Sequence, residues 1–265
     1  MQIAEYDSVL MKNGTVTRII PQTGGESFVV EAIMAGDGDS DPVSFSAKRI
    51  ILATGLVDEV PSTPGFREAW AKGVFWCPWC DGNEYAEQPL GIVAPLGSVA
   101  KLAEEILILN DDVIAFTNGT DTPENREIAE KNSPNWEGWF DKFNYTVDNR
   151  MISQLVRIQH PDTAAKEPSI PTTPEHDLFS IEFTTGESVE RTAFLTSFPN
   201  RQRSDLGLQL GVAVEKQRMV IDSEKGGITN VTGVYAIGDA DSDKATNVYY
   251  ALYSGKRASV NCHRK

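Results

Sequence analysis

Cysteine is scarce in this chain, with three residues among 265. That number excludes the disulfide framework that holds small secreted domains together. Long apolar runs are also missing, because a stretch such as 91–96 is far too short to cross a bilayer. The start, residues 1–5, has neither the basic nor the apolar region of a signal peptide. We therefore expect a cytoplasmic protein that does not enter membranes, in a compartment where thiols stay reduced.

Positive charge is also in short supply. The chain has 24 Lys and Arg residues against 38 Asp and Glu residues, a formal net charge of −14. Such a field repels nucleic acid and anionic membrane surfaces, so neither is expected as a partner. The apolar content of 40% allows a sizeable core, and the length suits one large or two ordinary domains.

The strongest motif is Cys77-Pro78-Trp79-Cys80-Asp81. Two thiols at positions i and i+3 can face each other on the first turn of a helix, where they can close and reopen a short disulfide. The helix N-terminus stabilises a thiolate there and lowers the thiol pKa. Asp81 adds a carboxylate that can accept a proton. We predict a redox dithiol with Cys77, Cys80 and Asp81 as catalytic residues.

Two other interpretations of the cysteine pair stay open. A CxxC motif is also half of a zinc site, which needs four ligands. The available supplements are Cys262 and His263, and adjacent residues rarely reach one metal together. The pair can also be buried and inert. We favour the redox dithiol and predict no metal site.

Two blocks of the sequence resemble antiparallel three-stranded meanders. Their segments are rich in Val, Ile and Phe and are separated by turn residues. The predicted strands are 15–20, 27–35 and 43–52 in the first block, and 155–159, 178–183 and 189–196 in the second. The connection over 160–177 contains four prolines and is expected to be an exposed excursion. The two blocks indicate two related units.

A βαβ start precedes the second block. We predict strands at 90–94 and 112–117 and helices at 98–109, 123–132 and 136–143. This order is typical of a doubly wound nucleotide-binding domain. The first block has no such start, so we expect one βαβ segment to be missing before Met1.

Near the C-terminus a short strand, 233–239, ends in Gly238-Asp239, and a helix is predicted over 246–260. The glycine allows a ligand to approach the backbone, and the carboxylate can accept hydrogen bonds from sugar-like hydroxyls. Gly and Asp are also common where a strand simply ends in a turn.

Taken together, these motifs resemble the low-molecular-weight thioredoxin reductase family of FAD-dependent pyridine nucleotide-disulfide oxidoreductases. Ala53-Thr54-Gly55, the CxxC-Asp-Gly element and the Gly-Asp strand occur in the family's order and spacing. The resemblance implies an α/β, FAD/NAD(P)-binding Rossmann-like fold with two domains. It implies an FAD-binding domain in two parts, 1–57 and 198–265, without its N-terminal βαβ. An inserted NAD(P)-binding-like domain, 58–197, carries the dithiol.

The resemblance also implies roles for single residues. Cys80 would be the thiol nearest the flavin, Cys77 would exchange with the substrate, and Asp81 would be the acid/base. Cofactor-binding positions implied by the family pattern are Thr54, Gly55, Gly238, Asp239, Thr246 and Asn247. Asp239 matches the residue that hydrogen-bonds the ribityl chain, and Thr246 and Asn247 lie where the last helix points at the isoalloxazine.

Two features depart from the family pattern. No strand–GxGxxG–helix segment for the FAD pyrophosphate occurs in the sequence. The NADPH-type loop reads Ala94-Pro95-Leu96-Gly97-Ser98, in which Pro95 donates no N–H and Leu96 brings a bulky side chain towards the expected phosphate position. The following strand end, 116–119, offers neither an acidic residue nor paired arginines. FAD is therefore the expected cofactor, and NADPH binding is expected to be largely lost.

The residues around the dithiol are aromatic. We expect Phe75 in the core and Trp76 and Trp79 lining a pocket for a small hydrophobic dithiol. This combination resembles the fungal dithiol oxidases that close disulfides in epidithiodiketopiperazine-type metabolites and pass electrons to O₂, although many of those carry His where Asp81 stands.

The predicted function is an FAD-dependent thiol–disulfide oxidoreductase that oxidises a small-molecule dithiol with O₂. The alternatives are an NADPH-dependent reductase acting on a thioredoxin-like protein and a truncated, non-catalytic remnant. The family is usually homodimeric, so a homodimer is a further expectation.

Overall fold

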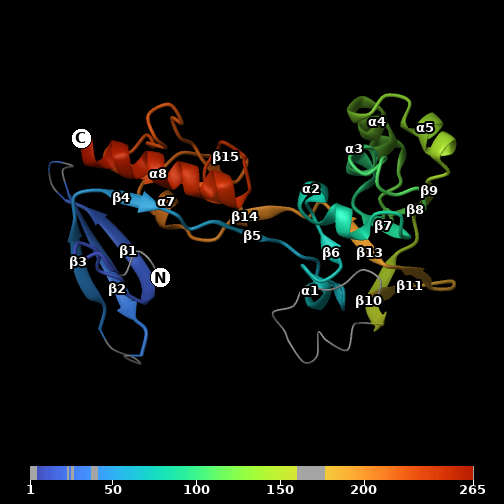
Figure 1. The fold of residues 1–265 in the computed structure, drawn as a ribbon, viewed down its shortest axis with the longest axis horizontal. Coiled ribbons are helices and arrows are strands. Elements are labelled where there is room, and N and C mark those ends of the chain that lie inside the picture. The colour runs from blue at the N-terminus through green and yellow to red at the C-terminus, as the bar shows by residue number, and fades with distance from the viewer. Residues whose placement is uncertain (1–4, 23, 25–26, 37–40, 160–176, 265) are drawn as a thin grey trace. The chain divides into compact units, whose positions relative to one another are not determined.

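The computed structural model describes residues 5–22, 24, 27–36, 41–159 and 177–264 (Figure 1). The chain forms two compact units. One, the split unit, combines residues 1–58 with 200–265, and the other, the inserted unit, is residues 59–199. The first and last parts of the sequence therefore fold together.

The split unit begins with an antiparallel meander in the order β1-β2-β3. Its strands are β1 (Gly14–Pro21), β2 (Phe28–Met34) and β3 (Val43–Ala47). The prediction of one strand over 43–52 was wrong, because β3 ends at Ala47 and β4 (Ile50–Leu52) belongs to a different sheet. The break falls at Lys48 and Arg49, where the chain leaves the meander. The break contains neither Gly nor Pro, so no turn signal in the sequence marks it.

The parallel pair in the split unit joins β4 to β17 (Val234–Ala236), with Ile50 opposite Val234 and Leu52 opposite Ala236. Both strands are short, and the predicted strand 233–239 gives way after Ala236 to a 3-10 helix, Gly238–Ala240. Ile50, Leu52, Val234 and Ala236 belong to a core that also contains Phe28 of the meander. This core fixes the ends of β4 and β17 side by side.

The split unit is completed by short elements and one long helix. They are β5 (Leu56–Asp58), β14 (Asn200–Gln202), α7 (Leu206–Gln209), β15 (Val214–Glu215), β16 (Arg218–Met219) and α8 (Val248–Arg264). β14 pairs with β5 antiparallel, which joins segments far apart in the sequence. The helix predicted over 246–260 begins two residues later and continues to Arg264.

The inserted unit is built on a parallel five-stranded sheet in the order β6-β13-β7-β8-β9. The strands are β6 (Val74–Phe75), β13 (Ala193–Thr196), β7 (Leu90–Val93), β8 (Val113–Phe116) and β9 (Thr146–Asp148). Along each strand, side chains alternate between the two faces of the sheet and pack into two separate hydrophobic cores. Ile92 and Leu195 pack in one core, and Val93 and Phe194 pack in the other. The sheet is therefore covered on both faces, as parallel sheets require.

Helices cover one face of this sheet. They are α3 (Leu96–Glu104), α4 (Pro123–Asn132) and α5 (Trp136–Phe143), and the last two have the predicted bounds. Thr122 explains the start of α4, because its side chain accepts the N–H of Asn125 and Pro123 follows at the first helical position. α3 begins two residues before the predicted start and ends at Glu104, and the following residues form turns. Ile108, which lies in the predicted helix 98–109 but in these turns of the structure, is 89% exposed.

The other face carries the second meander and the short helix α1 (Phe66–Ala69). The meander strands are β10 (Ile152–Gln159), β11 (Leu178–Phe183) and β12 (Val189–Arg191). The predicted strand 189–196 was wrong in the same way as 43–52, because β12 ends at Arg191 and β13 joins the parallel sheet. Most of the predicted excursion over 160–177 lies outside the described residues.

These elements confirm the predicted α/β, Rossmann-like fold with two three-stranded meanders. No helix in the described part of the chain is long and apolar enough to cross a membrane.

Candidate functional site

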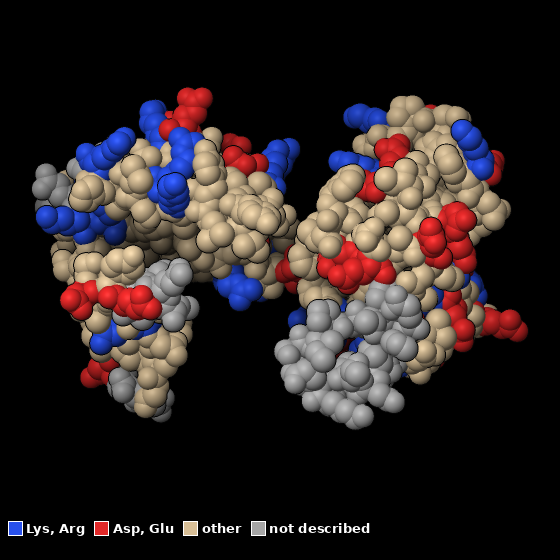
Figure 2. All heavy atoms as spheres, in the orientation of Figure 1, with Lys and Arg blue, Asp and Glu red and all other residues tan. Residues whose placement is uncertain are grey.

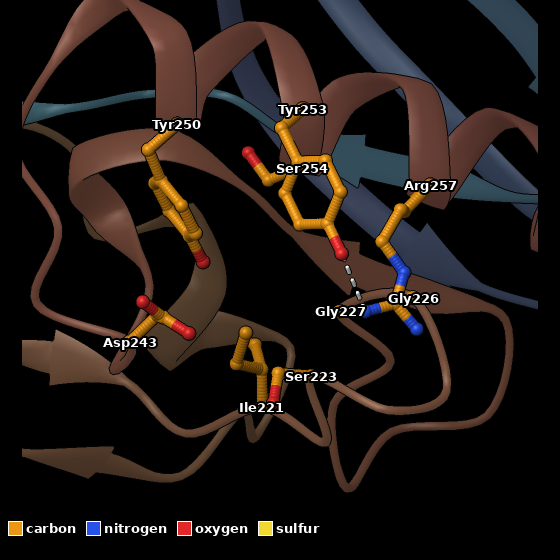
Figure 3. A pocket seen from close by; sticks show the side chains of 9 residues that line it. All are labelled: Ile221, Ser223, Gly226, Gly227, Asp243, Tyr250, Tyr253, Ser254 and Arg257. Atoms are coloured by element: carbon orange, nitrogen blue, oxygen red, sulfur yellow. Dashed lines mark hydrogen bonds between the residues drawn. The ribbon is translucent and has the colours of Figure 1, made fainter.

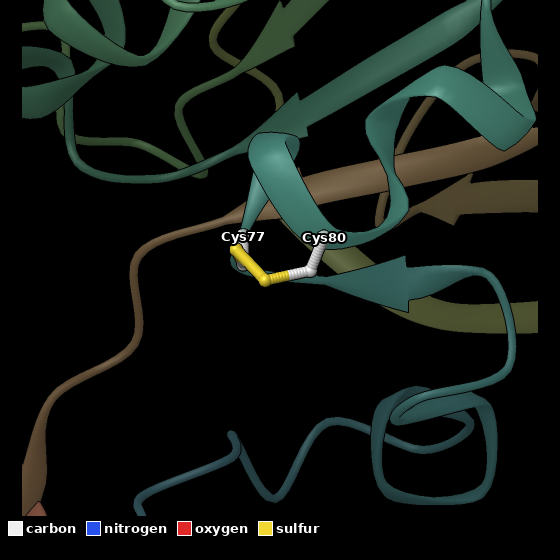
Figure 4. The surroundings of a disulfide bond; sticks show 2 residues. All are labelled: Cys77 and Cys80. Atoms are coloured by element: carbon white, nitrogen blue, oxygen red, sulfur yellow. A yellow bond between two sulfur atoms is a disulfide. The ribbon is translucent and has the colours of Figure 1, made fainter. Parts of the chain in front are cut away.

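Cys77 and Cys80 form a disulfide in the inserted unit (Figure 4). Strand β6 ends at Phe75, and the short helix α2 (Pro78–Asp81) begins with Pro78 at its first position. Cys77 is the N-cap of α2, and its carbonyl accepts the N–H groups of Cys80 and Asp81 at 3.1 Å each. The turn brings the two Cα atoms to 5.3 Å. The predicted dithiol is therefore held by backbone hydrogen bonds, with Cys80 exposed and Cys77 half-buried.

Asp81 lies next to the disulfide and is half-buried. Burial raises the pKa of its carboxyl group above the ordinary value. The pKa of the neighbouring Tyr85 is raised first by burial and then by the carboxylates of Asp177, Glu84 and Asp81. A carboxyl group that holds its proton more tightly is better suited to exchange protons with thiols than an ordinary carboxyl group.

The aromatic residues around the disulfide divide into core and surface. Phe75 is buried and stacks on Tyr85 with ring centroids 5.3 Å apart. Trp79 is 80% exposed and Trp76 is 45% exposed. Trp76 stacks on Trp70, with centroids 5.2 Å apart and an interplanar angle of 15°. The expected core position of Phe75 is confirmed, and the pocket expected at Trp76 and Trp79 stays a prediction.

The alternative zinc site gains no support from the structure. Across the ranges that it describes, no group of three or more His, Cys, Asp or Glu residues is placed to hold a metal ion. Cys262 is a free, half-buried thiol of the split unit, whereas Cys77 and Cys80 belong to the inserted unit.

Four predicted cofactor residues come together in the split unit. Thr54 and Gly55 follow β4, and Gly238 and Asp239 follow β17, so all four lie at the carboxyl ends of adjacent parallel strands. Ligands of α/β sheets bind at this end. Gly55 and Gly238 adopt positive φ values of 68° and 64°. The ordered pairing of β4 with β17 therefore brings two distant sequence motifs to one place.

Thr54 provides a test of whether a ligand fits there. Its Oγ1 atom is buried and has no hydrogen-bond partner among the described residues. A Cβ atom built on Gly55 would meet nothing within 4 Å. A buried polar atom without a partner beside open space suits a bound polar group. The residues present thus fit the sugar or flavin part of a nucleotide cofactor.

Thr246 and Asn247 are both exposed and precede α8. The Asn247 side chain accepts the N–H of Tyr250 at 2.8 Å, so it caps the helix. One turn later, the Cβ atom of Ala251 lies 3.7 Å from the Cβ position of Gly238, and Ser254 Oγ accepts the N–H of Gly238 at 3.1 Å. The first turns of α8 therefore pack against the Gly-Asp motif.

Three further residues at this end were not identified from the sequence. Gln202 donates to the carbonyls of Gln217 and Ala240, and its own Oε1 is buried without a partner in the described structure. Arg218 donates to the carbonyl of Asp239. The pKa of Asp58 is raised by burial and by the charge of Asp239. No motif marks these residues, because their neighbours are distant in the sequence.

A pocket beside α8 brings together polar residues of the split unit (Figure 3). Tyr253 accepts a hydrogen bond from Arg257, which also donates to the carbonyl of Glu224. Tyr250 donates to the buried carboxylate of Asp241. Tyr250, Tyr253 and Arg257 of this pocket thus bond to the protein itself, and we assign them a role in anchoring α8.

The loop that would hold a pyridine nucleotide is occupied by internal contacts. The N–H of Leu96 donates to Thr120 Oγ1 at 3.0 Å, and the N–H of Ser98 donates to the Pro95 carbonyl. The Leu96 side chain is fully buried in a core of the inserted unit, and the expectation that it lies near the phosphate position stays a prediction. A hydrogen bond between Thr117 and Asn149 lies at the end of β8. The N–H groups of Leu96 and Ser98 at the start of α3 are therefore used by the protein instead of facing a ligand.

Comparison with known proteins gives the family. The chain is 38% identical over 268 residues to a probable thioredoxin reductase of Arthroderma benhamiae, covering 99% of this chain and 64% of that protein. It is 33% identical to the thioredoxin reductase aclD of Aspergillus oryzae, covering 73% of this chain and 62% of that protein. The chain thus spans less than two thirds of the length of these relatives.

Solved structures agree on the fold. A putative thioredoxin reductase, TrxB, from Bacillus anthracis superimposes with a TM-score of 0.77 at 23% identity, covering 98% of this chain and 76% of that one. No family model matches the chain. On its relatives, its Rossmann-like fold and its Cys77–Cys80 pair, the chain belongs to the thioredoxin reductase-like family of flavin-dependent disulfide oxidoreductases.

Proposed function

We propose that the chain acts as an FAD-dependent thiol–disulfide oxidoreductase that oxidises a small-molecule dithiol to a disulfide, with O₂ as the final electron acceptor. The observation that carries the proposal is the Cys77–Cys80 disulfide beside two exposed tryptophans. Large apolar side chains at a reactive disulfide favour an apolar thiol compound as the partner. A cytosolic location agrees with this thiol chemistry.

The protein residues divide the work. A substrate thiolate attacks one sulfur of the disulfide, and we assign that position to Cys77. The second substrate thiol then attacks the mixed disulfide, which releases the oxidised substrate and leaves Cys77 and Cys80 as thiols. Asp81 holds or accepts the proton that the thiols exchange, which its raised pKa supports.

FAD would be held by the split unit and would supply the electron acceptor that restores the disulfide. Thr54 and Gly55 would face it from β4, and Gly238 and Asp239 from β17, with Asp239 bonding to ribityl hydroxyls. Thr246 and Asn247 would place the positive end of α8 near the ring. The unpartnered Thr54 Oγ1 supports this assignment. The inserted unit would then be a nucleotide-type domain that keeps the dithiol and no longer binds NADPH well.

Oxygen uptake tests the proposal. The purified chain is supplied with FAD and dithiothreitol, and O₂ uptake and H₂O₂ are measured together. We expect uptake that requires both compounds and yields one H₂O₂ for each dithiol oxidised. The same protein mixed with NADPH should show slow flavin reduction. Rapid, saturable reduction by NADPH, with reduction of a disulfide probe and no dithiol-dependent uptake, would instead establish the reductase.

A further inference from the structure

Negative charge is distributed very unevenly between the two units. Residues 59–199 contain 23 Asp and Glu residues against 10 Lys and Arg residues, a formal net charge of −13. The rest of the chain contains 15 against 14, a net charge of −1. Figure 2 shows many Lys and Arg side chains over the split unit and mostly acidic groups over the inserted unit. The unit that carries the disulfide therefore carries almost all of the net negative charge.

The same imbalance holds in the stretch of sequence that carries the disulfide. Residues 73–100 contain Asp81, Glu84 and Glu87 and neither Lys nor Arg. Within the described residues, none of these three carboxylates forms an ion pair. At the neighbouring Tyr85, burial and then the charges of Asp177, Glu84 and Asp81 raise the pKa, while the charge of Arg157 lowers it. Any substrate that reaches Cys77 or Cys80 enters the field of these carboxylates.

The apolar part of the surface lies at the centre of the same region. Trp79 stands between the two cysteines in the sequence and is 80% exposed, although Pro78 beside it is buried. Trp76 is 45% exposed and is fixed in orientation by stacking on Trp70. The exposed indole of Trp79 beside the disulfide offers a stacking surface for a flat apolar group.

We propose that Trp79, together with the carboxylates of Glu84 and Glu87, selects the substrate: a dithiol with a flat, apolar portion and no negative charge beyond its thiolate. Glutathione and acidic protein surfaces are disfavoured by repulsion. This inference rests on the proposed function, because it describes substrate choice at the same disulfide. Trp79 acts here as a specificity residue and takes no part in bond making.

Substrate selection can be measured in the thiol–disulfide exchange between the substrate dithiol and the Cys77–Cys80 disulfide. One substrate thiolate displaces a cysteine sulfur from the disulfide, and the second displaces the other, so the substrate loses two electrons and the protein disulfide gains them. The two protons of the substrate thiols end on Cys77 and Cys80. The reaction balances without flavin or O₂, so it can be measured on the chain alone.

The test compares three dithiols that differ only in distant charge. Dihydrolipoate is anionic, dihydrolipoamide is neutral, and the aminoethyl amide of dihydrolipoic acid is cationic. Each reacts with the disulfide form of Cys262→Ser protein, and the rate of thiol appearance is followed by alkylation and mass measurement. At low salt we expect the anionic compound to react about 5-fold more slowly than the neutral one, and the difference to fall below about 2-fold at 0.5 M salt.

Two double variants distinguish the effect of Glu84 and Glu87 from the effect of the net charge of the whole inserted unit. Glu84→Gln with Glu87→Gln should roughly halve the low-salt difference between dihydrolipoate and dihydrolipoamide. Glu104→Gln with Glu127→Gln removes the same charge from α3 and α4 of the same unit and should change the difference much less. Equal changes in both variants would contradict the role of Glu84 and Glu87.

Trp79→Ala tests the apolar part. It should slow exchange with 1,2-benzenedimethanethiol about 5-fold and with dithiothreitol less than about 2-fold, because only the aromatic compound loses a stacking partner. Equal rates for all three lipoyl compounds, or an unchanged aromatic rate in Trp79→Ala, would overturn this inference and leave the proposed function intact. Failure of every dithiol to reduce the disulfide would instead contradict the proposed function.

Discussion

At the scale of single residues, the proposed chemistry depends on two sulfur atoms in one short turn. Cys77 caps α2 and Cys80 lies within it, whereas Cys262 is a free thiol of the other unit. Neither cysteine of the pair can form the disulfide without the other. The distinction between the pair and the third thiol is therefore open to direct substitution.

We predict that Cys77→Ser and Cys80→Ser each abolish dithiol-dependent O₂ uptake by the FAD-supplied protein, at least about 10³-fold, because the covalent exchange step is lost. Cys262→Ser should keep uptake within about 2-fold. Bound FAD, measured by absorbance, serves as the control for folding. Full turnover by the Cys77 variant would show that the pair is not the reactive centre.

The raised pKa of Asp81 predicts how the stability of an Asp81→Asn variant depends on pH. Burial raises the pKa of its carboxyl group in the folded state, so the protonated form is favoured by folding. That contribution is present below the ordinary pKa and is lost as pH rises through the raised value. Asp81→Asn, which cannot ionise, should therefore be slightly more stable than the native protein at pH 7.

The advantage of Asp81→Asn should disappear below about pH 4, where both side chains are neutral. Urea unfolding at several pH values measures it. The comparison is clean because the Asp81 side chain caps no helix. A variant that is less stable than the native protein at pH 7 would show that the ionised carboxylate makes a favourable contact. Loss of dithiol exchange in the same variant would support the acid/base role.

Several features of the site could be read from the sequence. The spacing of Cys77 and Cys80 identifies the pair because both lie in one turn, and Gly238 and Asp239 are marked by the short apolar strand before them. Gln202 and Arg218 could not be found, because their partners come from other segments. The raised pKa of Asp58 could not be predicted either, because burial and the charge of Asp239 act on it only once the split unit has folded.

At the scale of elements, every predicted strand contains a strand, but several bounds were wrong. The predicted strands 43–52 and 189–196 each contain two strands, and the predicted strand 233–239 is a strand only over 234–236. The runs 43–52 and 189–196 contain neither Gly nor Pro, so no turn signal shows that the chain changes sheets within them. In each unit the last meander strand leads, after a short break, into a parallel strand. The bounds of α4 were predictable because Thr122 and Pro123 mark its start locally.

One glycine decides how α1 meets the second meander. Gly65 has a φ of 89°, and a Cβ atom there would lie 1.7 Å from the carbonyl oxygen of Leu155 on β10. We predict that Gly65→Ala lowers the free energy of unfolding by more than about 3 kcal/mol, since the strained backbone and the overlap add. Urea unfolding followed by tryptophan fluorescence measures the change.

Gly186→Ala is the matched control. Its φ of 85° is equally unfavourable for alanine, but the nearest atom is the end of the flexible Arg150 side chain at 2.9 Å. Its loss should be about 1 kcal/mol, the conformational cost alone. Similar losses at the two positions would mean that the contact of Gly65 with β10 is not as close as described.

At the scale of the whole molecule, the uneven charge gives the two units different physical properties. The inserted unit, with a net charge of −13, is strained by its own repulsion, while the split unit is nearly neutral. All five tryptophans of the chain lie in the inserted unit, so tryptophan emission reports on that unit alone. Tryptophan emission therefore reports on the unit that carries most of the net negative charge.

We predict that the midpoint of thermal unfolding, followed by tryptophan emission, rises by about 3 °C when sodium chloride is raised from 0.05 to 0.3 M, because screening weakens the repulsion between carboxylates. Chloride is used because sulfate stabilises most proteins by exclusion from their surface. The double variant Glu104→Gln with Glu127→Gln removes two exposed charges and should raise the low-salt midpoint and reduce its dependence on salt. A midpoint that does not move with salt, in the native protein and in the variant alike, would show that the carboxylates are spaced too widely to oppose folding. In that event their influence would be confined to approaching ligands, and selection of substrates by charge at the disulfide would have to operate without any measurable effect on stability.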